Sequence, residues 1–519
     1  MKKLLFISLI LAVVLSSCGY YGSGDLVGID RKPWYTPDPY GMLFVPPGSY
    51  NMGPSDQDVP NSMTATSKTV TVQGFWMDET EITNSEYRQF VYWVRDSMAM
   101  TVLAENPPEN YDSEGRDFFR AVDENEPNAL VLEAIGYDSY NFDGYRLLDW
   151  QSRVDYSDPY IKASLLENSD LYLKPPPELY HFMRRIDINT NNLYYEYFWV
   201  DLKQAAKKHN FRADGRQVEQ DVRRTNDREQ DAGLRIGRHW DPEDEEYEGT
   251  IKDREELKNR REWEDFEDRD VTSQFDFVMH ERTPVYPDTL CWMSDYTYSY
   301  NEPMTQMYFW HPAYDYYPVV GVSWKQAVAF SKWRSMLKNG YQRDTRDYYV
   351  NQYRLPTESE WEYASRGGLD LSMYPWGGLY TRNYSGCFIA NFKPMRGNYY
   401  DDGGVQTLMV ATYDPNEYGL YDMAGNVAEW TRNAFDESAY RFTHDLNPDY
   451  QYYAHPDDPP ALKRKVIRGG SWKDVAYYMQ NGTRTYEYQD SAKSYIGFRN
   501  VRTYLGRHRN DGGSYSQVY

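Results

Sequence analysis

The chain has 519 residues, of which 26% are charged and 17% aromatic, and its formal net charge is -23 at pH 7. This length predicts two or more domains, or one large domain with insertions. The aromatic content excludes a disordered chain, and the acidic balance argues against nucleic-acid and anionic-membrane partners, whose binding requires a clustered basic face.

The first 17 residues predict a lipoprotein signal peptide. Two lysines precede an apolar run from Leu4 to Leu15 that is too short to span a bilayer. The following Leu-Ser-Ser-Cys resembles a bacterial lipobox, so Cys18 is expected to carry lipid, although an ordinary signal peptide with a chance cysteine is the alternative. Gly19 after the cysteine favours the outer membrane, on its periplasmic face. Residues 18–40 then form a lipidated tether.

The main domain is predicted to span residues 41–503 and to begin with strands. Residues 42–53 read as strand, turn and strand, and residues 69–72 and 75–77 continue the strand pattern. Thr83 and Glu86 form a capping box that opens a helix running to about Asp96. Its apolar residues recur at helical spacing and are expected to be buried, namely Tyr87, Phe90, Val91 and Val94.

Between about residues 97 and 310 the pattern changes, which predicts a large insertion. Residues 201–270 within it are densely charged with mixed sign. They predict either a solvated helix or partly ordered segment, or a docking arm for a partner protein. The two interpretations are compatible with each other.

Regular patterns return at residues 318–322, which predict a short buried strand. Ser323 with Gln326, and Thr357 with Glu360, form two further capping boxes. Their helices are expected to bury apolar residues at steps of three and four, namely Ala327, Phe330, Trp333 and Leu337 in the first and Trp361 and Ala364 in the second. From Gly367 onward short strands alternate with long loops. These patterns predict an α+β domain with little regular secondary structure, followed by a tail at 504–519.

Residues 419–430, Gly-Leu-Tyr-Asp-Met-Ala-Gly-Asn-Val-Ala-Glu-Trp, predict a tight turn between buried residues. Such a turn either exposes a catalytic group or wraps its carbonyls and carboxylates around a cation. Cys291 and Cys387 lie far apart in the chain. They could pair in an oxidising compartment, or they could be two buried free thiols, and no zinc or haem spacing is present.

Eight ordered motifs together resemble the formylglycine-generating enzyme (sulfatase-modifying factor) family. The resemblance implies a fold related to C-type lectins, interrupted here by the insertion. The motifs are residues 52–53, 81–84, 318–324, 354–364, 374–377, 419–430, 468–472 and 497–499.

Enzymes of this family oxidise a sulfatase cysteine with molecular oxygen, using two cysteines that bind copper(I). Two thiolates hold this soft ion, and the substrate thiolate joins them. The two positions correspond to Asp474 and Met479, and neither side chain can act as a thiolate. The resemblance therefore implies a pseudoenzyme that does not use copper.

The resemblance also implies calcium at two places. The first set is Asp422 and Glu429 through their side chains, with the carbonyls of Gly425 and Val427. The second set is Asn391 and Asp402, with the carbonyls of Phe392 and Gly404. Hard oxygen ligands of this kind suit Ca²⁺, whereas the alternative is that these polar groups only hydrogen-bond within their own loops.

The lipobox, the tether, residues 76–96 and the insertion together resemble the GldK/PorK lipoproteins of Bacteroidetes gliding motility and type IX secretion. This resemblance implies a structural subunit of a periplasmic ring that self-associates and binds a GldN/PorN-type protein. The alternatives are a GldJ-like motility lipoprotein, a glycan- or peptidoglycan-binding module, suggested by the lectin-like fold and abundant Tyr and Trp, and an active formylglycine-type oxidase.

Overall fold

The computed structural model describes residues 38–54, 67–108, 119–121, 146–148, 154–172, 188–200, 278–295, 304, 307–344, 350–394, 398–454 and 458–505. The predicted signal peptide, Cys18, the charged segment at 201–270 and most of the predicted tail lie outside these residues. Residues Pro39–Tyr504 form one compact unit. None of its described helices is both long enough and apolar enough to cross a membrane.

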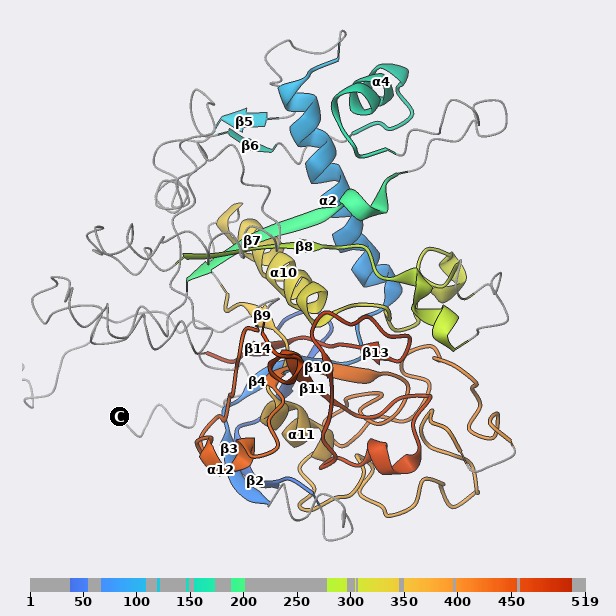
Figure 1. Cartoon of the computed structure of the whole chain (residues 1–519). Helices are drawn as coiled ribbons and strands as arrows, with labels where there is room; N and C mark the ends of the chain where they lie inside the picture. The colour runs from blue at the N-terminus through green and yellow to red at the C-terminus, as the bar shows by residue number, and fades with distance from the viewer. Residues whose placement is uncertain are drawn as a thin grey trace, which may run out of the picture. The chain divides into compact units, whose positions relative to one another are not determined.

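Two small sheets form the centre of this unit (Figure 1). The first contains, in spatial order, β1 (Met42–Val45), β4 (Phe75–Asp78), β14 (Val501–Thr503) and β9 (Tyr353–Arg354), all antiparallel. The second contains β12 (Thr485–Tyr488), β11 (Arg464–Arg468), β10 (Ala428–Ala434) and β13 (Ile496–Gly497), the last pair parallel. Three two-stranded ribbons are formed by β2 (Gly48–Met52) with β3 (Lys68–Val72), β5 (Phe119–Ala121) with β6 (Arg146–Leu148), and β7 (Tyr194–Val200) with β8 (Val278–Pro284).

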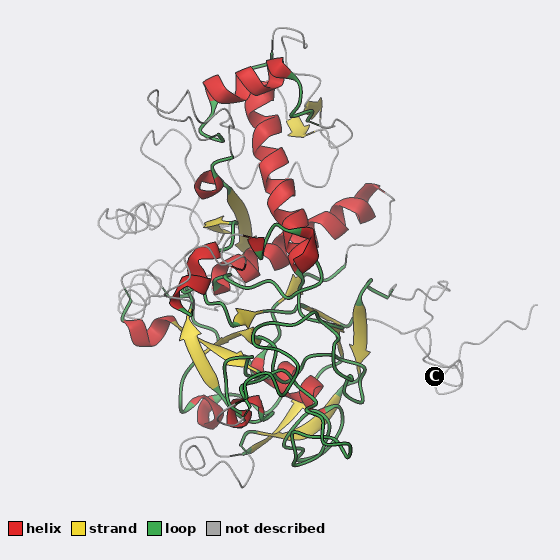
Figure 2. Ribbon diagram, turned by 90° about the vertical axis from the view of Figure 1, so that its right-hand side faces the viewer, coloured by secondary structure: helices red, strands yellow, loops and turns green. Residues whose placement is uncertain are grey.

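Three capped helices pack on these sheets, as the sequence predicts. They are α2 (Asn84–Glu105), α10 (Trp324–Asp344) and α11 (Glu358–Arg366), and the capping-box hydrogen bonds at Thr83, Ser323 and Thr357 are all present. The shorter helices are α4 (Pro159–Asn168) and α12 (Ala439–Phe442), and 3-10 turns occur at Thr190–Asn192, Thr289–Ser294, Pro312–Tyr314, Pro460–Lys463 and Ala476–Met479. In Figure 2 the helices lie mostly in the upper half and the loops mostly in the lower half, so the fold is α+β with little regular structure.

Three local expectations were wrong. Helix α2 runs nine residues past Asp96, because Ala99, Met100 and Leu103 continue its buried stripe. Residues 318–322 are buried but form no strand, since a single bridge from Thr83 to Pro318 is all the pairing they make. Leu337 of α10 is 49% exposed.

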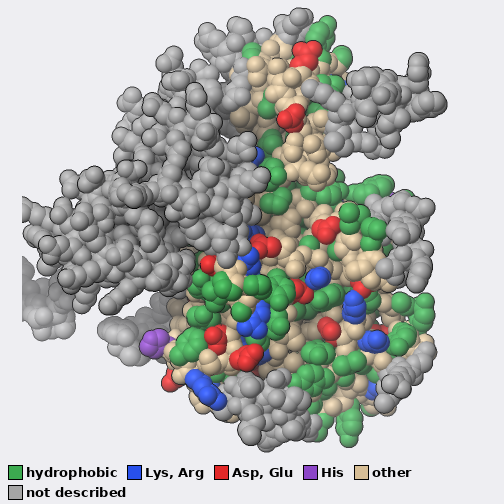
Figure 3. All heavy atoms as spheres, viewed as in Figure 1, with side chains coloured by type: hydrophobic (Ala, Val, Ile, Leu, Met, Phe, Trp, Pro, Cys, Tyr) green, Lys and Arg blue, Asp and Glu red, His purple; other side chains and the backbone are tan. Residues whose placement is uncertain are grey.

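Described residues of the predicted insertion share one hydrophobic core with the rest of the domain. Leu165 of α4, Tyr195 of β7 and Val285 pack in the same buried cluster as Trp430 and Phe498. Figure 1 shows α4 near the far end of α2, and β7 and β8 beside α10. These parts of the insertion therefore pack against the rest of the domain and extend its hydrophobic core. On the face drawn in Figure 3, charged side chains of both signs are scattered among hydrophobic ones.

Lys465 of β11 is a buried amine at the junction of a sheet and a helix. Its side chain is 1% exposed, and its Nζ donates a hydrogen bond to the carbonyl of Tyr452. The same Nζ lies 4.0 Å from the centre of the Trp324 ring. Burial, with a smaller contribution from Lys325, lowers the pKa of Lys465 to about 7.

We expect Lys465→Met to flatten the pH dependence of stability between pH 7 and about 10.4. In that window the unfolded chain holds a proton on Lys465 that the folded protein lacks, so wild-type stability rises with pH by roughly 2–4 kcal/mol. Urea unfolding at several pH values measures this slope. Lys338→Met on α10 is the control, and an unchanged slope in Lys465→Met would contradict the assignment.

Candidate functional site

The glycine-rich turn before β10 has left-handed backbone at four residues. The φ angles are 83° at Gly419, 54° at Asp422, 83° at Gly425 and 58° at Asn426. A Cβ atom at Gly425 would lie 2.2 Å from the carbonyl oxygen of Asn391, so a side chain there would collide with the backbone. The turn that carries the first predicted calcium set is thus folded directly against the segment that carries the second.

Asn426 connects this turn to four other segments. Its N–H donates to the carbonyl of Asn391 at 2.8 Å, and its carbonyl accepts from the Trp472 N–H at 2.9 Å. Its Oδ1 accepts from the Leu408 N–H at 2.9 Å, and its Nδ2 donates to Glu81 Oε2 at 2.7 Å. Since Asn426 is 2% exposed, water does not replace these bonds, and the side chain holds the loops together.

Three carboxyl groups and one guanidinium cluster at the turn. Asp422 and Glu429 belong to the turn, and Glu81 and Arg499 come from other segments. The Glu429 carboxylate accepts from Arg499 Nη2 at 2.6 Å and from Trp361 Nε1 at 2.7 Å. Glu81 is fully buried, and burial, followed by the charges of Asp422 and Glu429, raises its pKa well above the ordinary value. Burial also raises the pKa of Asp422 to about 6. The carboxyl groups of this cluster therefore outnumber its guanidinium, and burial favours the protonated forms of Glu81 and Asp422.

The first predicted calcium set fits an ion only in part. Glu429 is already paired with Arg499, whose Nε and Nη2 both donate to it. Asp422 accepts one hydrogen bond at Oδ2, from the Ala411 N–H at 2.7 Å. Of the two side chains in the set, Asp422 is therefore the better candidate ligand.

The second predicted set fits calcium better. Asn391 is 1% exposed, and its Oδ1 has no hydrogen-bond partner among the described residues, while its Nδ2 donates to the Gln406 carbonyl and to Asn426 Oδ1. Asp402 is buried and accepts from the Phe392 N–H at 2.8 Å, which places its carboxylate beside this segment. Burial raises the pKa of Asp402. A buried, unpartnered amide oxygen near a buried carboxylate is a donor set that Ca²⁺ satisfies.

Both sets rely on amide and carbonyl oxygens as much as on acids. Within the described ranges, no group of three or more His, Cys, Asp or Glu side chains is arranged to hold a metal ion. A site made only of acidic, imidazole and thiolate ligands is thus not found there. The sequence expectation of mixed oxygen ligands is the one that the side chains can meet.

Asp474 and Met479, which the family resemblance predicts to lie at the positions of the copper-binding cysteines, both have protein partners. Asp474 Oδ2 accepts from Ser471 Oγ at 2.6 Å, and its carbonyl accepts from the Lys393 N–H at 2.8 Å. Burial raises the pKa of Asp474. Met479 is fully buried in an apolar cluster with Tyr374, Ala390, Phe392 and Ala424. Neither side chain offers the soft thiolate that copper(I) requires.

Neither cysteine of the described chain is in a disulfide. Cys291 is buried, and burial raises its thiol pKa, whereas Cys387 is exposed. The expectation of two buried thiols was therefore wrong for Cys387, which lies on a surface loop, and the alternative of a pair is not realised.

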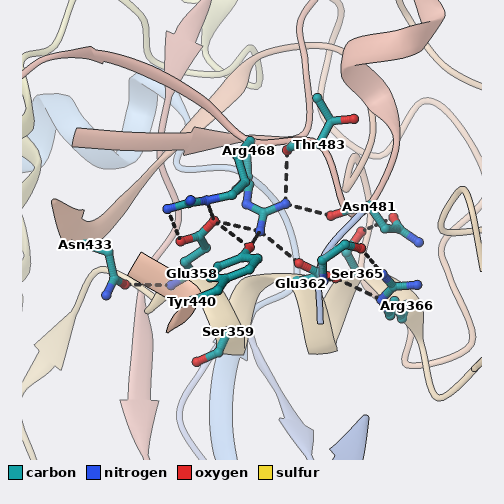
Figure 4. A network of polar contacts seen from close by, with 12 residues as sticks. Glu358, Ser359, Glu362, Ser365, Arg366, Asn433, Tyr440, Arg468, Asn481 and Thr483 are labelled. Carbon is teal, nitrogen blue, oxygen red and sulfur yellow. Dashed lines mark hydrogen bonds and ion pairs between the residues drawn. The ribbon is translucent and has the colours of Figure 1, made fainter. Parts of the chain in front are cut away.

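A buried ionic network joins two of the sequence motifs (Figure 4). Arg468 Nη2 lies 2.8 Å from Glu358 Oε1 and 2.8 Å from Glu362 Oε2, both on α11. Glu362 also pairs with Arg366 at 2.6 Å, and Glu358 with Arg484 at 2.5 Å. The sequence does not predict these pairs, because Arg468 is more than 100 residues from either glutamate. The one hint in the sequence is that Arg468 directly precedes two glycines, Gly469 and Gly470.

Comparison with known proteins agrees with the fold. A bovine (Bos taurus) inactive C-alpha-formylglycine-generating enzyme 2 is 35% identical over 189 residues, which is 35% of this chain and 49% of that protein. The bovine formylglycine-generating enzyme is 32% identical over 195 residues, 36% of this chain and 45% of that protein. The chain thus spans about half the length of the curated relatives it matches.

Among solved structures, PvdO from Pseudomonas aeruginosa is similar at 14% identity and a TM-score of 0.37, covering 89% of this chain and 94% of that chain. The family described as "Sulfatase-modifying factor enzyme 1-like domain" matches residues 32–129 and 270–504. The unmatched interval falls inside the predicted insertion, and the matched part is well over half of the chain. The chain therefore belongs to the sulfatase-modifying factor enzyme 1-like domain family.

Proposed function

We propose that this protein is a non-catalytic, lipid-anchored structural subunit of the periplasmic ring of the type IX secretion and gliding motility machinery, of the GldK/PorK type. The non-catalytic part of the proposal rests on the two positions at which the enzymes of the family are expected to have copper-binding cysteines. There the chain has a hydrogen-bonded carboxylate, Asp474, and a fully buried thioether, Met479. The bovine relative that is 35% identical is also named as an inactive enzyme.

The sequence supports the anchored and ring-forming parts of the proposal. Cys18 follows an apolar run and would hold the protein on the periplasmic face of the outer membrane. Residues 76–96, which carry the resemblance to GldK/PorK proteins, begin in β4 and continue into α2, where Tyr87 and Phe90 are fully buried. A GldN/PorN-type protein is the proposed partner.

Replacing Cys18 tests the anchor. Cys18→Ala is expected to move the protein out of the outer-membrane fraction and to stop export of type IX cargo, because the lipid is the proposed attachment. Fractionation and secretion assays measure both effects. Cys387→Ala is the matched control, since that exposed thiol is not a lipidation site. If Cys18→Ala stayed tightly bound to the membrane and fully functional, the anchored role would fail.

Copper binding separates the structural role from an oxidase. The wild type is expected neither to bind copper(I) tightly nor to consume oxygen with a cysteine-containing peptide. A variant carrying both Asp474→Cys and Met479→Cys tests whether the fold around these positions still accepts two thiolates. Oxygen consumption by the wild type would overturn the non-catalytic assignment.

We further propose calcium as a structural cofactor, held mainly by the second set. Millimolar calcium is expected to stabilise the wild type by about 2.7 kcal/mol when its concentration is a hundred times the dissociation constant. Asp402→Asn should remove most of this gain, because it keeps the shape of the side chain but removes its charge. Thermal unfolding with calcium or with a chelator measures the gain. Asp401→Asn, an exposed neighbour, is the control, and a wild-type melting temperature unaffected by chelation would count against the site.

A further inference from the structure

Strand β12 is an edge of the second sheet, and one side of it pairs with no strand among the described residues. The Phe435 N–H donates to the carbonyl of Arg464 at 2.9 Å, so the backbone groups of Arg464 face β10 and not β12. Tyr488 lies opposite Arg464, and Tyr486, two residues earlier, has the same orientation. The N–H and carbonyl groups of both tyrosines therefore point away from β11, toward the open edge.

Of these two tyrosines, Tyr486 is the one whose backbone groups remain available at the edge. The Tyr488 N–H donates to Glu487 Oε1 at 3.0 Å, and the Tyr488 carbonyl accepts from the Ser491 N–H at 2.9 Å. The N–H and carbonyl of Tyr486 make no hydrogen bond to any residue that the structure describes. An unpaired N–H and carbonyl on an edge strand are the groups to which an extended peptide adds.

An arginine without a counter-ion lies on the face of the sheet that carries the two tyrosine rings. The guanidinium carbon of Arg464 is 4.8 Å from the centre of the Tyr486 ring and 5.3 Å from that of the Phe435 ring. Its Nε donates to the carbonyl of Ala461 at 3.0 Å, whereas its two Nη groups donate to no described residue. Arg468, on the same strand, pairs with two glutamates. Arg464 therefore keeps free donors where a neighbouring arginine has none to spare for a partner.

The aromatic rings hold the Arg464 guanidinium in place and remain open to solvent themselves. The Phe435 and Tyr486 rings are 4.7 Å apart, and the Tyr486 and Tyr488 rings are 6.2 Å apart. Tyr486 is 41% exposed and Tyr488 is 39% exposed. Stacking on aromatic faces orients the planar guanidinium before a ligand arrives, and its fork of N–H donors matches a carboxylate through two parallel hydrogen bonds.

A carboxylate carried by an extended peptide satisfies all of these groups. Glu487, the one acid of β12, alternates with the two tyrosines and so belongs to the opposite face, where its Oε2 accepts from Tyr495 at 3.3 Å. A sugar could cover the rings, but it would not pair with the backbone of Tyr486 as a strand does. The open backbone groups therefore favour a peptide, and the free donors of Arg464 favour an acidic side chain on it.

We propose that the open edge of β12 binds an extended, acidic peptide segment of another protein as an antiparallel strand. An Asp or Glu of the peptide lies opposite Tyr486 and exchanges backbone hydrogen bonds with it. Because residues opposite each other share a face, the same acidic side chain passes over the tyrosine rings to Arg464. Backbone pairing supplies affinity, and the arginine selects the acid. This site is separate from Cys18, Asp474 and Met479, on which the proposed function depends.

The test uses the full chain with Cys18→Ser and a fluorescent probe peptide, Thr-Val-Glu-Val-Thr with blocked ends. Fluorescence anisotropy is expected to show saturable binding that weakens as salt is added, because an exposed ion pair contributes. Replacing the glutamate of the probe by glutamine should weaken binding at least tenfold, and so should Arg464→Gln. A probe methylated on the glutamate nitrogen should lose binding, whereas one methylated on the following valine nitrogen should keep it, because only the first nitrogen faces Tyr486.

Arg441→Gln is the matched control, because Arg441 on α12 is also exposed and lies away from β12. It should bind the probe like the wild type, and both variants should keep the wild-type melting temperature. Absence of probe binding, or equal binding by Arg464→Gln and the wild type, would overturn the proposal. Sacculi that bind the wild type but not Arg464→Gln, without any peptide binding, would indicate a glycan instead. Probe binding that appears only when residues 241–248 are deleted would indicate that the chain's own acidic run occupies the edge.

Discussion

Arg468→Met is expected to lower the free energy of unfolding by roughly 3–5 kcal/mol, because buried carboxylates and backbone carbonyls lose the hydrogen bonds that Arg468 donates, although Arg484 and Arg366 still pair with Glu358 and Glu362. The Arg468 side chain is 0% exposed and pairs with Glu358 and Glu362 at 2.8 Å each. Its Nη1 also donates to the carbonyls of Asn481 and Thr483. Methionine keeps most of the side-chain volume and removes all of these donors.

Urea unfolding at pH 7 measures this loss. Arg432→Met is the control, since Arg432 lies 3.8 Å from Asp449 in a partly exposed pair that should contribute less than about 1 kcal/mol. Adding Glu362→Gln to Arg468→Met should lower the stability further, because it removes the counter-ion of buried Arg366. Equal stability of the Arg468 and Arg432 variants would show that the network does not hold the domain together.

The same network predicts sensitivity to acid. Burial raises the pKa of Glu358, but Arg484 and Arg468 outweigh it and hold this pKa below its usual value. The stability that Glu358 contributes is therefore fully present above its unfolded pKa, about 4.3, and is lost as pH falls through the folded value. Arg468→Met should reduce this loss between pH 5 and pH 3, because it removes one of the two cations responsible.

Asn426→Ala is expected to lower the free energy of unfolding by about 3–4 kcal/mol. It leaves the Leu408 N–H and Glu81 Oε2 without their partner, while Glu81 Oε1 still accepts from the Val427 N–H, and each buried unsatisfied group costs about 1–3 kcal/mol. Alanine also fits the left-handed backbone at φ 58° less well than asparagine does. Hydrogen exchange should speed up in the loop around Leu408, which loses its contact with the turn.

Asn447→Ala is a matched control for the backbone effect. Asn447 is also left-handed, with φ 45°, and its Oδ1 accepts from the Gln73 N–H at 2.8 Å, but it is exposed. Its replacement should cost no more than about 1 kcal/mol, because water can replace the lost bond. If both variants lost the same stability, backbone strain rather than the connecting role of Asn426 would explain the effect.

Local patterns predicted the three long helices and the first four strands. The apolar spacing of Tyr87, Phe90 and Val94 identified the buried face of α2, and the capping boxes located the helix starts to the residue. The end of α2 was predicted too early. Its stripe of buried residues continues past Asp96 into residues whose composition indicated an insertion. Residues 318–322 were predicted as a strand because a run of buried valines occurs both in sheets and in extended loops. In the structure the Val319 N–H donates to the carbonyl of Ile82, outside any sheet.

The candidate site could be predicted only as a set of positions. The family resemblance predicts that Asp474 and Met479 stand where the enzymes have thiolates, and neither side chain can act as a thiolate. The family resemblance suggested that Asp422 and Glu429 of one turn bind the same ion. In the fold, Glu429 pairs with Arg499, which is 70 residues away in the sequence and lies between β13 and β14. Its carboxylate therefore already has a counter-ion.

The sequence by itself determined the starts of the three long helices, the first four strands and the family, because each depends on neighbouring residues or on residue type. Only the tertiary structure decided which charges meet and that Asn391 Oδ1 has no partner among the described residues. Such contacts join loops that are far apart in the chain. Their energies come from burial and from distances between atoms, which no local periodicity encodes.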